Sequence, residues 1–123
     1  MIEVVVAERC TQCNRCVAVC PGNVFDPGLQ GPPVIARPED CSTCFMCELY
    51  CRWDALYVAP DCHRPVPVTA AHIKASGLLG QFRRDSGWDE WSGDPRYANE
   101  HWRMDDVFAR ARELSAATGL RNK

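Results

Sequence analysis

Nine cysteines stand out in this 123-residue chain, because cysteine thiolates bind metals and carry out redox chemistry. Eight of them fall into two copies of one pattern, C-x2-C-x2-C-x3-C, and each member of the second copy follows its counterpart by 31 residues. The first copy is Cys10, Cys13, Cys16 and Cys20, and the second is Cys41, Cys44, Cys47 and Cys51. A constant offset of this kind indicates an internal duplication.

The composition and the first residues bear on where these thiols work. The formal net charge is −2, which does not indicate a nucleic-acid partner. No apolar run reaches the roughly 18 residues that a membrane span needs. Residues 1–9 include Glu3 and Glu8 and lack the basic and apolar regions of a signal peptide. We therefore expect a cytoplasmic protein without a membrane span, in a compartment where cysteines rarely form disulfides.

The spacing of the eight cysteines predicts iron–sulfur chemistry. Three thiolates with two residues between neighbours line a tight loop. The amides of this loop can donate hydrogen bonds to sulfur, and the loop can wrap three corners of a cubane cluster. Two zinc sites are an alternative, although zinc sites use CxxC pairs separated by a longer span. Disulfides are a further alternative. We expect Cys62, which precedes His63, to be a free thiol, with a ligand or redox role as the alternative.

Short strands and helices must position these loops. Strands are predicted at residues 2–7, 24–26, 33–36 and 55–59, and short helices at residues 14–20 and 45–51. The turn residues between positions 27 and 32 predict a hairpin of the second and third strands, and the last strand is expected to pair with the first. Nine apolar residues should exclude water from the metal: Val4, Val6, Val17, Val24, Phe25, Ile35, Phe45, Leu56 and Val58.

Residues 2–60, which carry both motifs, resemble the bacterial-type ferredoxins with two [4Fe-4S] clusters. The resemblance implies an α+β dicluster fold with a pseudo-two-fold internal repeat, two short helices and two small antiparallel ribbons. It also implies that the last cysteine of each motif ligates the other cluster. Cluster one would then use Cys10, Cys13, Cys16 and Cys51, and cluster two would use Cys20, Cys41, Cys44 and Cys47. The family usually has proline where this chain has Arg52, and we expect this cation to raise the potential of cluster one.

The composition changes after a proline-rich linker at residues 61–69. Residues 63–123 contain no cysteine and have a net charge of +2, whereas residues 1–62 have a net charge of −4. The tail, residues 70–123, should form one or two helices. A helix over residues 70–84 would be weakened by two glycines, residues 85–97 look irregular, and apolar spacing predicts another helix at residues 104–114.

We expect this tail to dock on a partner subunit, because aromatic and arginine side chains anchor protein interfaces. The alternative is that it folds back on the ferredoxin-like domain at residues 1–60. The predicted anchors are Phe82, Arg83, Trp88, Trp91, Tyr97, Trp102 and Phe108.

The layout is similar to the iron–sulfur beta subunit of adenylylsulfate reductase, whose tail embraces a flavoprotein subunit of the fumarate reductase type. This resemblance implies FAD in a partner subunit, and an external redox carrier. The sequence has no glycine-rich dinucleotide loop, P-loop or HExxH motif, so no catalytic residues are expected. Our hypothesis is an electron-transfer subunit of a heteromeric, for example heterodimeric, FAD-dependent oxidoreductase. The alternatives are a free diffusing ferredoxin with an accessory tail, and a regulatory protein with structural or sensory clusters.

Overall fold

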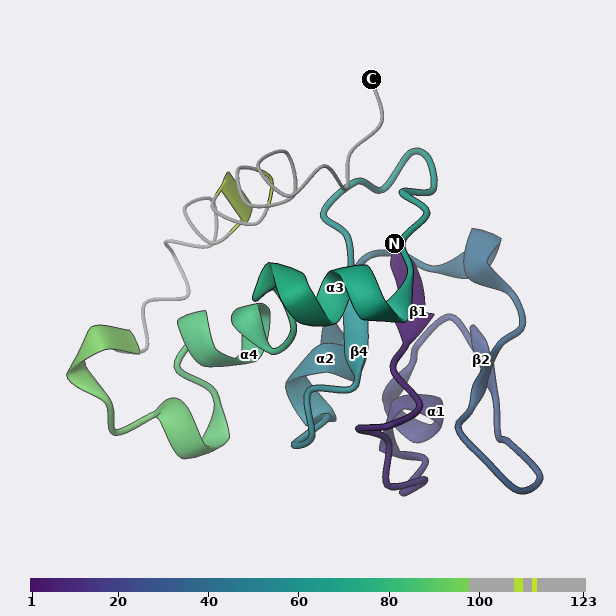
Figure 1. Cartoon of the computed structure of the whole chain (residues 1–123), viewed down its shortest axis with the longest axis horizontal. Coiled ribbons are helices and arrows are strands. Elements are labelled where there is room, and N and C mark those ends of the chain that lie inside the picture. The colour runs from purple at the N-terminus through teal and green to yellow at the C-terminus, as the bar shows by residue number, and fades with distance from the viewer. Residues whose placement is uncertain (98–107, 110–111, 113–123) are drawn as a thin grey trace.

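The computed structural model describes residues 1–97, 108–109 and 112 (Figure 1). Trp102 and most of the helix predicted at residues 104–114 therefore lie outside the described residues. Within the described part, no helix is both long and apolar enough to cross a lipid bilayer.

The cysteine-rich half is a small α+β unit, as predicted. Its elements are β1 (Ile2–Val5), α1 (Arg15–Val19), β2 (Phe25–Asp26), β3 (Val34–Ile35), the 3-10 turn η1 (Pro38–Asp40), α2 (Met46–Tyr50) and β4 (Leu56–Val58). β1 pairs with β4 and β2 pairs with β3, both antiparallel. The strand pairing is the one that the sequence predicts, although each strand is shorter than its predicted range.

The duplication in the sequence is also a duplication of backbone geometry. Three pairs of non-glycine residues, each pair 31 positions apart, share a left-handed backbone: Gln12 and Thr43 (φ 63 and 56), Asn14 and Phe45 (φ 59 and 62), and Asn23 and Asp54 (φ 53 and 51). Because this conformation is uncommon for residues with a Cβ, the matched pairs show the same local turn at three corresponding positions of the two copies. The two helices that follow, α1 and α2, pack against each other.

Two groups of buried side chains form the core. The first surrounds the cysteine loops and consists of Ile2, Val24, Phe25, Phe45, Cys47, Leu56 and Val58. The second consists of Val6, Tyr57, Ala59, Val66, Ile73, Leu78 and Leu79. The second group joins residues from both halves of the chain, so the described part of the tail packs on the cysteine-rich half.

The prediction of one continuous helix over residues 70–84 is wrong. The chain forms α3 (Ala70–Ser76) and α4 (Gln81–Asp85) instead, because Gly77 and Gly80 adopt left-handed φ values of 79° and 76°. Thr69 caps α3 by accepting a hydrogen bond from the amide of His72 at 3.1 Å. The predicted irregular region contains two 3-10 turns, η2 (Asp89–Trp91) and η3 (Pro95–Tyr97).

The described part of the tail follows the alternative that the sequence left open. Figure 1 shows α3 lying across β1 and β4, where Ile73 packs with Val6 and Tyr57. The linker also joins the core, because Val66 is buried and its amide donates a hydrogen bond to Glu3 Oε2 at 2.6 Å. Docking of the tail on a partner stays a prediction.

Candidate metal centres

Eight of the nine cysteines line two cavities, and Cys62 is exposed and lines neither. A cavity of about 350 Å³, open to solvent, is lined by Cys10, Cys13, Cys16 and Cys51. A second open cavity of about 320 Å³ is lined by Cys20, Cys41, Cys44 and Cys47. Each cavity thus combines three cysteines of one motif with the last cysteine of the other. This is the crossed arrangement that the resemblance implies.

Backbone amides point at the sulfur atoms in matched positions of the two halves. Gln12 donates to Cys10 Sγ and Thr43 donates to Cys41 Sγ, both at 3.4 Å. Val24 donates to Cys20 Sγ at 3.5 Å, and Ala55 donates to Cys51 Sγ at 3.4 Å. Hydrogen bonds of this kind stabilise thiolates and are one way in which a protein sets the potential of a cluster.

The local backbone explains why the last cysteine of each motif faces the other half. Cys16 and Cys47 lie on α1 and α2, and each helix begins after a left-handed residue. Cys20 and Cys51 follow the helix ends with extended backbones (φ −68°, ψ 114° and φ −93°, ψ 100°). Since α1 packs on α2, these turns bring each last cysteine to the cavity of the neighbouring motif.

The surroundings of the thiols disfavour free thiolates. Burial raises the pKa of Cys16 to about 11, and burial also raises the pKa values of Cys47 and Cys51. Thiols of this kind stay protonated at neutral pH unless a metal displaces the proton. The four thiols and the apolar walls of each cavity fit a cubane cluster.

Glu48 is a buried acid beside this site that the sequence reasoning missed. Its Oε2 accepts a hydrogen bond from the amide of Val58 at 2.8 Å, and burial raises its pKa to about 8. Its position inside a predicted helix carried no sign that this side chain would be buried.

Comparisons with known proteins agree with the geometry. A family model described as a 4Fe-4S dicluster domain matches residues 9–56. An uncharacterized ferredoxin of Methanocaldococcus jannaschii is 41% identical over 51 residues, which cover 41% of this chain and 79% of that protein. The chain belongs to the 4Fe-4S dicluster ferredoxins. A ferredoxin of Methanothermococcus thermolithotrophicus is 40% identical over 48 residues, or 38% of this chain and 77% of that protein.

Membership of this family makes the chain an iron–sulfur protein of the electron-carrying, ferredoxin type. No solved structure matches the chain. The family match ends at residue 56, so the similarity to adenylylsulfate reductase rests on the layout of the sequence alone.

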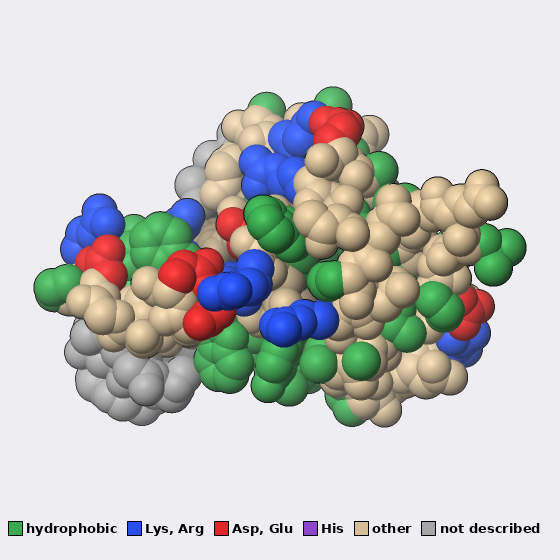
Figure 2. Space-filling view, turned by 90° about the horizontal axis from the view of Figure 1, so that it is seen from below, with side chains coloured by type: hydrophobic (Ala, Val, Ile, Leu, Met, Phe, Trp, Pro, Cys, Tyr) green, Lys and Arg blue, Asp and Glu red, His purple; other side chains and the backbone are tan. Residues whose placement is uncertain are grey.

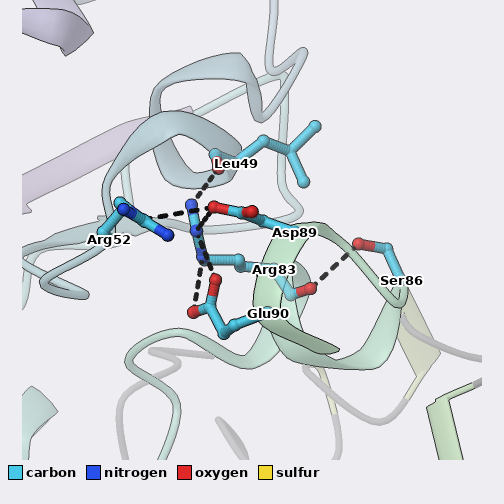
Figure 3. A network of polar contacts seen from close by, with 6 residues as sticks. All are labelled: Leu49, Arg52, Arg83, Ser86, Asp89 and Glu90. Atoms are coloured by element: carbon cyan, nitrogen blue, oxygen red, sulfur yellow. Dashed lines mark hydrogen bonds and ion pairs between the residues drawn. The ribbon is translucent and has the colours of Figure 1, made fainter. Parts of the chain in front are cut away.

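The structure corrects the prediction for Arg83, because its side chain is only 1% exposed. Its guanidinium donates to the carbonyl of Leu49, at the end of α2, and pairs with Asp89 and Glu90 (Figure 3). The unpaired carbonyls of a helix end attract cations, so a buried arginine is stable there. Arg83 joins the tail to α2 and is not available to a partner.

The other described anchors contact aromatic rings of the same chain. Phe82 stacks on Phe45 with ring centroids 4.3 Å apart, and the ring of Phe108 lies 5.3 Å from Phe45. The remaining ring pairs are Trp88 on Tyr50 at 5.7 Å and Trp91 on Tyr97 at 5.4 Å. Phe45 lines the second cysteine cavity, so the stacked ring of Phe82 supports the wall of that cavity.

Proposed function

We propose that the chain relays single electrons through two [4Fe-4S] clusters. Cluster one is held by Cys10, Cys13, Cys16 and Cys51, and cluster two by Cys20, Cys41, Cys44 and Cys47. The observation that carries this proposal is the crossed lining of the two cavities. When bound, a cluster supplies one-electron chemistry, and its protein surroundings set its potential.

The residues of the chain bind the metal, orient the sulfur atoms and exclude water. Ile2, Phe25 and Val58 are buried and line the second cavity. The amide of Ile2 also donates to Cys41 Sγ at 3.3 Å. An apolar wall favours the less negative cluster in each redox step, whereas the amide donors to sulfur favour the more negative one, so the two features act on the potential in opposite directions. The packing of α1 on α2 brings both cavities to one small core.

We further propose that the chain works as the electron-transfer subunit of a heteromeric FAD-dependent oxidoreductase. A flavin exchanges electron pairs with a substrate and single electrons with clusters, so it complements a chain of this type. Trp88, Trp91 and Tyr97 support the proposal, because each is only partly buried and leaves ring surface for a partner.

A free ferredoxin is the second candidate. Two observations favour it: the described tail packs on its own core, and both relatives are ferredoxins. In this case the tail would stabilise the cluster domain.

Anaerobic purification from the native host through a small affinity tag tests both functions. A larger flavoprotein that co-purifies in a one-to-one ratio, with FAD bound, supports the subunit. A brown protein of 13.8 kDa alone, with about eight irons per chain, supports the free ferredoxin. Replacing Trp91 by alanine should release the flavoprotein, whereas replacing the exposed Leu29, far along the chain from the tail, should not. Zinc in place of iron would contradict the electron relay itself.

A further inference from the structure

The two halves of the duplicated unit differ in charge at equivalent positions. At the offset of 31, two arginines of the first copy, Arg9 and Arg15, align with Asp40 and Met46 of the second. Arg52 of the second copy, which follows Cys51 of the cluster-one cavity, aligns with Pro21 of the first. The three arginines and Asp40 are exposed. Because the backbones of the halves match, the difference places cations around cluster one and an acid beside cluster two.

An exposed tryptophan lies at the cavity of cluster one, and arginines are placed near it by the cavity lining, by the sequence and by one hydrogen bond. Trp53 is 56% exposed, and it lines this cavity together with Arg15. Arg52 precedes Trp53 in the sequence, and Arg9 Nη1 reaches the carbonyl of the next residue, Asp54, at 3.5 Å. We call these four residues, Arg9, Arg15, Arg52 and Trp53, the cluster-one face. Figure 2 shows Lys and Arg side chains beside hydrophobic ones on the side of the molecule seen from below.

Nearby carboxylates neutralise this face only in part. Asp89 pairs with Arg52 at 3.2 Å and also with Arg83, and Glu8 pairs with Lys74. The printed hydrogen bond of Arg9 is to the backbone carbonyl of Asp54, and the half-buried carboxylate of the same residue offsets part of the Arg9 charge. The charge of Arg15 therefore remains at the cavity that Cys13 also lines, and Cys13 is itself exposed.

We propose that the cluster-one face is the docking surface for an electron-transfer protein with an acidic surface. The inference rests on the proposed electron relay, and it adds where on this chain the partner binds and which charge the partner's surface carries. Arginine and tryptophan are the side chains that most often anchor an interface, and a cationic face steers an acidic partner to it. The exposed edge at Cys13 makes the path for the electron short.

The opposite charge at cluster two provides an internal comparison. Glu39 and Asp40 are exposed on η1, directly before Cys41. A basic partner should prefer this side, so the two ends of the molecule select partners of opposite charge.

Two probe proteins of high reduction potential test the proposal: plant plastocyanin, which is acidic, and mitochondrial cytochrome c, which is basic. The reduced holoprotein is mixed anaerobically with each oxidised probe, which takes up one electron per metal, Cu(II) to Cu(I) or Fe(III) to Fe(II), without any bond being made or broken. Binding of oxidised plastocyanin to the oxidised holoprotein is measured separately at low ionic strength. The variants are Arg9→Gln with Arg15→Gln, Glu39→Gln with Asp40→Asn, and the control Arg64→Gln.

Replacing Arg9 and Arg15 should slow the reduction of plastocyanin by about tenfold at low salt, weaken plastocyanin binding, and leave cytochrome c reduction unchanged. The difference should vanish at high salt, because screening removes steering. Replacing Glu39 and Asp40 should affect cytochrome c only, and Arg64→Gln should affect neither probe. If the arginine variant has its full iron content and reduces and binds plastocyanin as well as the wild type does, the docking surface is overturned and the electron relay stays intact. A chain that binds no iron overturns both.

Discussion

The guanidinium of Arg83 donates a hydrogen bond to the carbonyl of Leu49, 34 residues earlier, at the end of the helix that carries Cys47. Asp89 and Glu90 hold the other nitrogens of the same guanidinium. One arginine therefore connects η2 and α4 of the tail to α2, which carries Cys47 of one cavity and is followed by Cys51 of the other.

Replacing Arg83 by methionine should detach this part of the tail. The carbonyl of Leu49 loses its donor, and the buried acceptor costs about 1–3 kcal/mol of the free energy of unfolding. Guanidinium unfolding, followed by the fluorescence of Trp88 and Trp91 and by the visible absorption of the clusters, measures the loss. Arg96→Met is the matched control, because Arg96 pairs with Asp94 on the exposed surface and should not change the midpoint. Equal midpoints for the two variants would contradict a structural role of Arg83.

The iron content of cysteine variants distinguishes crossed ligation, in which the last cysteine of each motif binds the other cluster, from ligation of each cluster by one motif alone. Cys13→Ala alone should remove one cluster, about four of about eight irons. Adding Cys51→Ala should remove no more iron, because both cysteines line the same cavity. Adding Cys20→Ala should remove the second cluster as well. Iron and sulfide analysis after anaerobic reconstitution distinguishes the two, and Cys62→Ala should retain all of the iron. The reverse result for the two double variants would mean that each motif holds its own cluster.

The turn between α3 and α4 depends on two glycines for different reasons. Gly77 needs only its left-handed φ of 79°, since a Cβ would meet nothing within 4 Å. Gly80 has φ 76°, and its Cβ would also lie 2.4 Å from Asp54 Cγ. Gly77→Ala should cost about 1–2 kcal/mol of backbone strain, and Gly80→Ala should cost more. Thermal unfolding of the two holoproteins measures the difference. Identical melting temperatures would show that Asp54 moves aside without cost.

Glu3 should make stability depend on pH. Burial raises the pKa of its carboxyl above the ordinary value of 4.5, although the amide of Val66 and the amino group of Met1 oppose this. The folded state then holds the proton more tightly than the unfolded state, so stability falls as the pH rises through the folded pKa. Glu3→Gln keeps an oxygen for Val66 and should be more stable than wild type at neutral pH.

This advantage should shrink as the pH approaches 4.5, where the wild-type carboxyl is protonated. Unfolding in guanidinium between about pH 4 and pH 8 measures it, with the exposed Glu39→Gln as the control. An advantage that stays constant over this range would show that Glu3 has the same pKa in both states.

The charge of Arg52 should act on one cluster. Its side chain is exposed and pairs with Asp89 at 3.2 Å, so the cation that the sequence places after Cys51 is partly offset by the tail. Arg52→Gln should lower the reduction potential of cluster one and leave that of cluster two unchanged, since a nearby cation favours the more negative cluster. Redox titration followed by electron paramagnetic resonance resolves the two, with Arg64→Gln as the control. A parallel shift of both potentials would contradict this local effect.

Local chemistry made much of the site predictable. The spacing of the cysteines predicts the loops and the short helices α1 and α2, because both depend on residues close together in the sequence. The split between α3 and α4 could be predicted only in part. Gly77 and Gly80 weaken a helix, but the close approach of Gly80 to Asp54 sets where it breaks. The burial of Glu48 carries no local signal, because its packing depends on β4.

The sequence by itself determined the duplicated motif, the short elements around it and the positions of the candidate donor thiols, because a cysteine loop is shaped by its own turns. Only the tertiary structure decided where the described part of the tail packs. The composition of a charged, aromatic segment does not distinguish packing on its own core from binding to a partner, since both kinds of interface use the same side chains. The long-range packing of Ile73 on Tyr57 and the hydrogen bond from Arg83 to Leu49 place the described tail on its own core.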